Sequence, residues 1–342
     1  MKKLVEIELR FQVPAEVRAD VAAEMARRAA NLEHRTLAAI YLDTADRRLA
    51  RAGIAWRLRR EGRRWIQTLK GGGASTLERF EHEVIRPGPV HDARAHAGTS
   101  VGDKLVATLD DAQKEGIEVG ARFRTEVRRT VRRLRTRGAV VEVSFDEGRL
   151  IANDTTRRIR ELEFELVSGS PVAMLALAER WRKRFGLLLE PRSKAERGDR
   201  LADGFKFPPV RKAGRAAYAR DAAAIVALGV VVDECVAHMA YNAIGIADGD
   251  PAQCVDHVHQ LRVGIRRLRS ALRSFEGWAP SPPPTLLADL RALFTALGAS
   301  RDSAVLDSGV VQDLAKVGAP KLAVTAGAGG PDPVEVVRSA VT

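Results

Sequence analysis

The sequence VEIELRF at residues 5–11 decides the fold, because it alternates apolar and charged side chains without interruption. Successive side chains of a β-strand point to opposite faces, so Glu6, Glu8 and Arg10 share one face and the apolar residues share the other. The segment at residues 161–166 repeats this pattern with three glutamates opposite three apolar residues. Both segments therefore predict strands with one charged face and one apolar face.

Other predicted strands carry pairs of polar or charged residues at the same spacing, namely Arg57 with Arg59, Thr68 with Lys70, and Glu81 with Glu83. A solvent-exposed face explains any one such strand, but several of them in one domain favour another arrangement. Helices packed outside a barrel would cover the apolar faces and leave the charged faces turned inward. Because a charged interior is costly unless its charges are compensated, the pattern predicts a polyanionic ligand that arrives with a divalent cation, Mg²⁺ or Mn²⁺.

The chain up to residue 204 mixes short alternating segments with a few helical ones, which predicts an α+β domain without strict βα alternation. Its predicted strands are residues 5–13, 38–43, 55–60, 64–70, 79–85, 123–135, 140–147, 150–153 and 159–168, and its predicted helices are residues 14–30, 101–109 and 171–185. Residues 205–215 combine glycine, a proline pair and basic residues, which is typical of a linker. Residues 216–342 predict an all-α domain with helices at 218–248, 251–277 and 284–297 and a disordered, glycine-rich C-terminal tail.

Composition favours an anionic partner, because 56 Lys and Arg outnumber 44 Asp and Glu and give a formal net charge of +12 in 342 residues. The first residues reach a charge before any apolar run, so we expect no signal peptide and a cytoplasmic protein. The longest apolar stretch, residues 222–232, is about half of what a bilayer-spanning helix needs, which predicts a core helix and no membrane partner. Cys235 and Cys254 lack the spacing of a zinc site or a disulfide framework.

The motifs of the first domain resemble the CYTH superfamily, the triphosphate tunnel metalloenzymes. Glu6-Ile7-Glu8-Leu9-Arg10 resembles the ExExK signature, and further matching pieces follow in order at residues 41–44, 57–59, 67–70, 79–81, 123–129, 145–148, 161–165 and 193–198. A single ExExK match has little weight, whereas this ordered series extends over nearly the whole first domain.

The resemblance implies an eight-stranded antiparallel β-barrel tunnel whose glutamates hold divalent metal and whose Arg and Lys side chains grip a triphosphate. Carried over to this sequence, the expected metal ligands are Glu6, Glu8, Asp146, Glu163 and Glu165. The expected substrate-binding cations are Arg57, Arg59, Lys70, Arg79, Arg129 and Lys194. We expect Glu6, Glu8, Arg10, Lys70, Glu163 and Glu165 to be catalytic.

One position departs from the family signature, since Arg10 stands where the family usually has lysine. A guanidinium keeps the positive charge and can bind phosphate through two N–H groups, but it cannot readily lose a proton as a lysine can. If the lysine serves only as a cation, Arg10 preserves activity, and if it tunes the attacking water, turnover suffers.

A stripe of basic residues marks the second domain, where His259, Arg262, Arg266, Arg269 and Arg273 are spaced three and four apart. Such a stripe is either the solvated face of an amphipathic helix or a phosphate-binding surface. Residues 258–269 resemble the first signature of the CHAD family, helical domains with conserved histidines, and residues 297–302 resemble its second landmark. The family implies polyphosphate binding, but only the first half of its helical repeat has a counterpart here.

We therefore expect metal-dependent hydrolysis of inorganic triphosphate in the tunnel and polyphosphate binding by the helical domain. Two alternatives remain open at this point: a hydrolase of thiamine triphosphate or a nucleoside triphosphate, and a non-catalytic polyphosphate-binding adaptor. Specific nucleic-acid binding is not expected, since only 5% of residues are aromatic and few could stack on bases. The sequence leaves the oligomeric state open.

Overall fold

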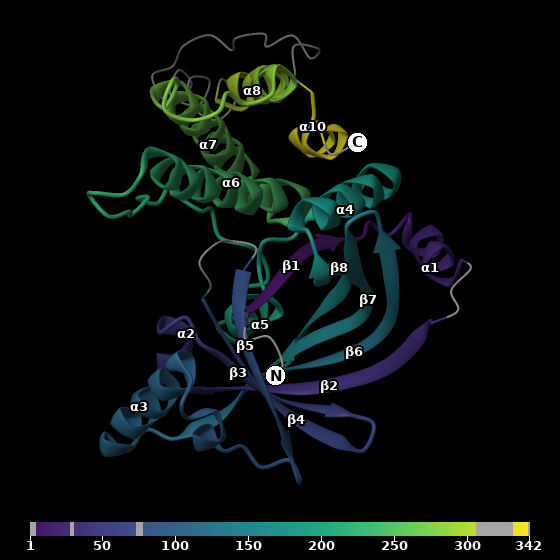
Figure 1. Cartoon of the computed structure of the whole chain (residues 1–342), viewed down its shortest axis with the longest axis vertical. Coiled ribbons are helices and arrows are strands. Elements are labelled where there is room, and N and C mark those ends of the chain that lie inside the picture. Colours follow the sequence, from purple (N-terminus) through teal and green to yellow (C-terminus); the bar gives the residue numbers. More distant parts are fainter. Residues whose placement is uncertain (1–4, 28–30, 73–77, 306–330, 341–342) are drawn as a thin grey trace, which may run out of the picture. The chain divides into compact units, whose positions relative to one another are not determined.

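The computed structural model describes residues 5–27, 31–72, 78–305 and 331–340. The chain divides into two compact units, Met1–Lys206 and Phe207–Thr342. The first unit contains all of the β-strands and the second is helical (Figure 1).

The first unit is built around a closed antiparallel barrel of eight strands. The strands are β1 (Val5–Gln12), β2 (Glu33–Thr44), β3 (Ala55–Glu61), β4 (Arg64–Gly72), β5 (Glu78–Arg86), β6 (Val119–Thr136), β7 (Ala139–Ala152) and β8 (Thr155–Gly169). Their order is β5-β4-β3-β2-β6-β7-β8-β1, and a pairing of β1 with β5 closes the barrel. A two-residue strand, β9 (Leu188–Leu189), pairs with the end of β1. The predicted eight-stranded barrel is confirmed.

Several strands extend beyond their predicted ranges, and the differences are largest for β7 and β2. Residues 140–147 and 150–153, predicted as separate strands, are the single strand β7. Gly148 allows this continuity, because a Cβ at this position would lie 2.0 Å from the Glu126 carbonyl oxygen on β6. The prediction also shortened β2, which begins at Glu33 and pairs with β6 over its whole length. Long strands with mixed polarity are therefore harder to delimit than short alternating ones.

Helices cover the apolar outer faces of the strands. Helix α1 (Arg18–Ala26) and helix α4 (Pro171–Phe185) pack their Met25 and Trp181 side chains into a core with Phe11 and Phe164. Helices α2 (Arg48–Arg51) and α3 (Ser100–Lys114) cover β2, β3 and β4, and a short 3-10 helix, η1 (Ala93–His96), precedes α3. This external packing turns the charged faces of the strands into the barrel, as the alternation predicts.

Helix α5 (Lys194–Ala202), which the sequence reading missed, enters the barrel. Its Leu201 joins a core with Phe123, Leu150 and Ile159, which lie on inward faces of β6, β7 and β8. The contact is so close at Gly198 that a Cβ there would lie 2.1 Å from the Phe123 ring. The helix therefore fills one part of the interior and brings its first residue, Lys194, to the charged part.

In the described part of the second unit, four helices pack around one apolar core. They are α6 (Ala224–Asp248), α7 (Cys254–Ser274), α8 (Pro284–Val305) and α10 (Pro333–Ser339), with the 3-10 helix η2 (Pro251–Gln253) before α7. The prediction of a disordered tail is wrong for α10, whose Val336 and Val337 are buried in this core. The predicted tail covers about the last thirty residues, and apart from residues 331–340 it lies outside the described residues.

Helix α6 exposes much of its apolar surface. In the described part of the chain, it is the one helix that is long and apolar enough to cross a membrane, judged by length and composition alone. Of its most apolar segment of 18 residues, 28% is buried. Ile225 and Val226 are more than half exposed, whereas Cys235 and Ile244 are buried. The predicted core helix is therefore buried over only part of its length.

Buried polar side chains join the segment predicted as a linker to the helices. His257 Nδ1 lies 3.0 Å from the Asn242 side-chain oxygen, and the Asn242 amide donates to the Arg211 carbonyl at 3.0 Å. Arg211 also pairs with Glu234 at 2.7 Å. Because His257 and Asn242 are fully buried, they stabilise the packing of α6 and α7 instead of facing a ligand.

Candidate active site

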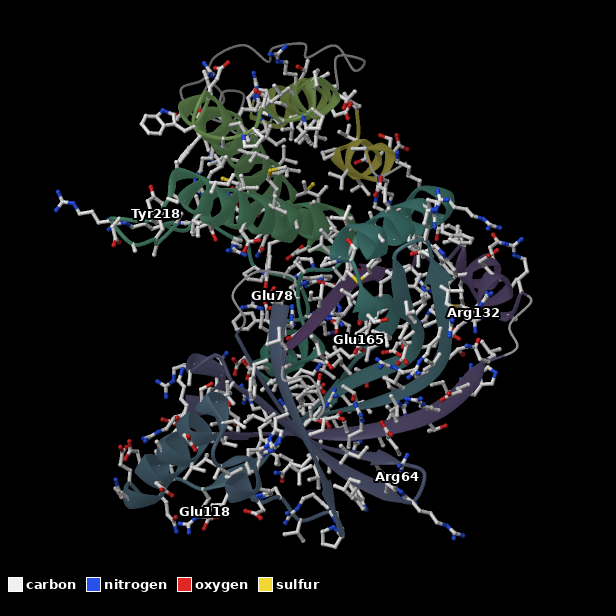
Figure 2. The ribbon with its side chains drawn as sticks, viewed as in Figure 1. Arg64, Glu78, Glu118, Arg132, Glu165 and Tyr218 are labelled. Atoms are coloured by element: carbon white, nitrogen blue, oxygen red, sulfur yellow. The ribbon has the colours of Figure 1, made fainter. Side chains whose placement is uncertain are left out.

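The barrel brings the sequence-predicted site residues into one charged lumen. Glu165, for example, lies on β8 inside the barrel (Figure 2). The predicted metal ligands and cations come from β1, β3, β4, β5, β6, β7, β8 and the start of α5. They are Glu6, Glu8, Arg10, Arg57, Arg59, Lys70, Arg79, Arg129, Asp146, Glu163, Glu165 and Lys194.

Lys194 is the centre of the most densely paired part of the lumen. Its Nζ lies 2.6 Å from Glu163, 2.8 Å from Glu161 and 2.9 Å from Asp146. Arg129 approaches the same acids, at 2.7 Å from Asp146 and 2.5 Å from Glu163. Burial opposes ionisation of Glu163, but Arg129 and Lys194 outweigh it and hold its pKa well below the usual value.

Lys70 organises a second part of the lumen. Its Nζ is 2.5 Å from Glu81 and 3.2 Å from Glu6. Arg57 lies 3.9 Å from Glu81 and donates to the Tyr41 hydroxyl at 3.3 Å, while the Tyr41 ring stacks on an aromatic ring of β6. These contacts put two cations and a phenol within one region of the interior.

The side chain of Arg10 is engaged within the protein. Its Nε pairs with Glu8 at 2.5 Å, and its Nη1 donates to the Arg192 carbonyl at 2.5 Å. Only 6% of Arg10 is exposed. The guanidinium therefore links β1 to the segment before α5, a bridge for which the single ammonium of the family's usual lysine has fewer donors.

Two further cations lie on the walls contributed by β3 and β5. Arg59 is 2.7 Å from Glu61 and 3.2 Å from Glu83, and burial together with the nearby Arg57 lowers its pKa. Arg79 Nη2 donates to the Pro191 carbonyl at 3.4 Å. The buried Nε atoms of Arg57 and Arg59 have no hydrogen-bond partner among the described residues. These buried donors lack an acceptor, which a bound anion could supply.

Acidic side chains are crowded where β1 meets β8. Glu8 and Glu165 are direct cross-strand partners, a position where like charges destabilise a sheet. Burial, reinforced by Glu142 and Glu8, raises the pKa of Glu165 to about 7. Burial also raises the pKa of Glu6 to about 8, helped by a hydrogen bond with Glu81.

This crowding tests whether the lumen suits a divalent metal. Glu6, Glu8 and Glu165 are hard oxygen donors whose mutual repulsion a cation would relieve, so the residues fit such an ion. Within the described residues, no three His, Cys, Asp or Glu side chains already converge as a metal site. Asp146 and Glu163, also predicted as ligands, are instead neutralised by Arg129 and Lys194.

Several lumen residues were missed by the sequence reading. Glu190 is 2% exposed, pairs with Arg192 at 2.7 Å and accepts a hydrogen bond from Gln12 at 2.7 Å. Burial opposes its ionisation, but Arg192 and Arg197 lower the pKa of Glu190 to about 2. Gln12 continues the alternation of β1, so the sequence could have predicted that it faces the lumen. Glu190 and Arg192 lie in no long strand, so no alternation marks them.

The predicted stripe on α7 is only partly open to solvent. Arg266 and Arg273 are exposed, and His259 and Arg269 are half-buried. The Arg262 guanidinium lies over the Phe294 ring of α8, 4.3 Å from its centroid. The stripe therefore presents two exposed cations, and Arg262 also contributes to helix packing.

The fold and the lumen together define the class of protein. It is a closed antiparallel barrel whose interior holds arginines with unpartnered N–H donors on β3 and closely spaced glutamates on β1 and β8. The chain belongs to the CYTH family, because the CYTH domain model matches residues 4–198, more than half of its length. The CHAD domain model matches residues 230–330 in the helical unit. Both predicted resemblances are confirmed.

Similar proteins include an inorganic triphosphatase of Haemophilus influenzae, 26% identical over 200 residues. The match covers 57% of this chain and 54% of the relative, so this chain spans about half the length of that protein. Among solved structures, a Hippeastrum protein described as a candidate adenylyl cyclase with a dominant triphosphatase activity is 19% identical, with a TM-score of 0.40 over 56% of this chain and 94% of that one. A candidate adenylate cyclase from Bacillus halodurans is 16% identical, with a TM-score of 0.39 over 57% and 96%.

Proposed function

We propose that the barrel hydrolyses inorganic triphosphate with the help of a divalent metal. The observation that carries this proposal is the pair of buried, unpartnered Nε donors of Arg57 and Arg59 in a lumen that also contains crowded carboxylates. The name of the H. influenzae relative, an inorganic triphosphatase, supports the same substrate.

The strand order suggests how a short phosphate chain would lie. Strand β3, which carries Arg57 and Arg59, is four strands from β8 in either direction around the barrel. Cations on β3 would bind one end of the phosphate chain, while Glu8 and Glu165 lie on the opposite side of the lumen. Guanidinium groups suit this task because each can bind phosphate oxygens through two parallel N–H groups.

The metal would be held by carboxylates of β1 and β8, and we propose Glu6, Glu8 and Glu165 as its nearest ligands, with Glu163 and Asp146 beyond them. When bound, a divalent cation polarises a phosphoryl oxygen and lowers the pKa of a coordinated water. Lys194 and Arg129 would hold Glu163 ionised and in place, so that the acidic wall keeps its geometry. Lys70 would neutralise phosphate charge, since its amine lies between two glutamates that orient it.

A non-catalytic adaptor is the second candidate, and the engagement of Arg10 favours it. The guanidinium contacts Glu8 and the Arg192 carbonyl, so less of it is available to a substrate. The variant Arg10→Lys separates the two functions. If the wild-type lumen is catalytic, we expect the variant to keep kcat within a few-fold, whereas a gain of hydrolysis from an inactive wild type would favour the adaptor.

For the helical unit we propose weak, salt-dependent binding of inorganic polyphosphate by the α7 stripe. Arg266 and Arg273 are its exposed cations, and His259 and Arg269 lie beside them. Few exposed charges give modest affinity that falls with ionic strength, with a salt slope set by the small number of phosphate contacts. Titration of the full chain with polyphosphate at low and high salt, compared with Arg266→Glu/Arg273→Glu, tests this assignment.

The substrate is tested by measuring phosphate release from a panel of triphosphate, longer polyphosphate, thiamine triphosphate and ATP with Mg²⁺ or Mn²⁺. We expect the highest kcat/KM for inorganic triphosphate, because the aromatic rings described in the lumen, Tyr41 and Phe123, are buried against each other and leave little surface for a base or a thiazole. If kcat/KM were higher for thiamine triphosphate or ATP, that compound would be the preferred substrate. The proposed reaction type, hydrolysis of a phosphoanhydride bond, would remain.

A further inference from the structure

A second basic surface lies on the outside of the barrel, away from the lumen. The pairing register sets Arg60 of β3 beside Ala38, Ala38 beside Glu126, Glu126 beside Arg149, and Arg149 beside Arg158. Cross-strand partners share one face of a sheet, and Ile40, two residues from Ala38, packs against the external core under α2 and α3. This row therefore faces outward.

Two more arginines extend the row along β6, because Arg124 and Arg128 are each two residues from Glu126 and share its face. We call Arg60, Arg124, Arg128, Arg149 and Arg158 the outer arginine face. All five are exposed, with 75% of the Arg128 side chain and 56% of the Arg149 side chain open to solvent. In Figure 1 the strands β2, β6 and β7 that carry much of this row form one continuous wall.

The positive charge of this face is mostly uncompensated. Arg149 pairs with Glu126 at 2.7 Å, and Glu147 pairs with Arg18 at 2.5 Å, so the two nearby acids are already engaged. Arg124 and Arg158 have no acidic partner in the described parts of the chain, and Arg128 approaches Glu147 only to 4.0 Å. Like charges on neighbouring strands repel one another, so a face of this kind favours a bound polyanion.

The residues of the outer arginine face indicate which type of polyanion it would bind. Neighbouring strands are about 4.8 Å apart, so Arg124, Arg128, Arg149 and Arg158 start from three adjacent strands, β6, β7 and β8, while Arg60 lies beyond β2. The outward residues nearest the arginines of β6, β7 and β8, namely Thr36, Ala38, Ile40, Ile151 and Thr156, are small or aliphatic. Two aromatic rings, Trp65 beside Arg60 and His34 beside Thr130, lie at the margins of the face, so the described residues offer no row of rings on which successive bases could stack. A flexible chain of phosphates without bases matches such a surface through bidentate contacts alone.

We propose that the outer arginine face binds long-chain inorganic polyphosphate. This inference goes beyond the proposed function, because it adds an anchoring site outside the lumen and does not depend on hydrolysis. A chain held on this wall would raise the local concentration of phosphate polymer at the barrel.

The test uses the full chain carrying Arg266→Glu/Arg273→Glu, which weakens the proposed α7 site. In this background, Arg124→Glu/Arg158→Glu is compared with the matched control Arg51→Glu/Lys114→Glu. The control makes the same charge change at exposed positions of α2 and α3. Binding of polyphosphate about 100 phosphates long is titrated at several salt concentrations, and triphosphate hydrolysis is measured in parallel as a check on the lumen.

We expect the outer-face variant to bind polyphosphate at least about tenfold more weakly than the control, with a salt slope reduced by about 1 to 2 because two contacts are lost. Its triphosphate hydrolysis should equal that of the control. Equal polyphosphate affinity of the two variants would overturn the inference. Equally tight, equally sensitive binding of single-stranded DNA of matched charge would overturn the choice of polyphosphate. Absence of hydrolysis in all variants would count against the proposed function alone.

Discussion

Lys194 offers the sharpest test of the charged lumen, because one amine contacts three carboxylates at 2.6–2.9 Å and the side chain is only 11% exposed. The variant Lys194→Met keeps the length of the side chain and removes its charge. Breaking a buried ion pair by removing one partner costs about 3–5 kcal/mol. Arg129 still pairs with two of the acids and Arg197 with the third, so we expect the lower end, about 3 kcal/mol.

This loss corresponds to a decrease in Tm of about 6–12 °C for a domain of this size. The assay is thermal unfolding followed by circular dichroism in the β-sheet region without added metal or phosphate. Lys114→Met, which alters a surface pair with Asp111, is the control and should leave Tm unchanged. The double variant Lys194→Met/Glu163→Gln should recover part of the loss, since Arg129 would then have only the charge of Asp146 to compensate. Equal Tm values for Lys194→Met and the control would refute a buried, paired Lys194.

The remaining predictions concern protonation, catalysis and packing. Because Glu6 and Glu165 have raised pKa values in the folded state, the metal-free barrel binds extra protons at neutral pH, and its Tm should fall as pH rises from about 6.5 to 8. Below this range the lowered pKa of the buried His96 has the opposite effect; a rising Tm between about pH 6.5 and 8 would contradict the prediction. Glu163→Gln should lower kcat at least about a hundredfold, whereas Arg59→Ala should mainly raise KM. If both variants kept wild-type kinetics, neither residue would take part in catalysis or substrate binding. Gly198→Val should lower Tm by displacing α5 from the barrel, and an unchanged Tm would show that α5 does not fill the interior.

The strands and their inward faces follow from the sequence because period-two alternation has only one geometric meaning in a sheet. The segment at residues 5–11 predicts β1 with its acids and Arg10 inside, and the structure confirms both the strand and the barrel. Alternation weakens where both faces are polar, as along β6, so strand ends there were misplaced. Helix α10 was missed because a glycine-rich segment precedes it and only its tertiary contacts stabilise it.

The residue types of the site are predictable, but their pairing is not. A sequence shows that Lys194 is a cation near the lumen through family resemblance, yet only the fold shows that Glu161 joins its partners. Likewise Arg10 can be identified as a departure from the family lysine, while its bond to the Arg192 carbonyl links residues far apart in the chain. Long-range contacts of this kind leave no periodic signal along the sequence.

The most direct test of the central claim is phosphate release from inorganic triphosphate by the full chain, measured with Mg²⁺ or Mn²⁺ and again after chelation. Our account predicts rapid release with metal, none above background in excess EDTA, and full recovery when metal is restored, because the crowded glutamates require a cation to accept a polyanion. Undiminished release by demonstrably metal-free protein, or no release with either metal from protein that binds triphosphate, would contradict it.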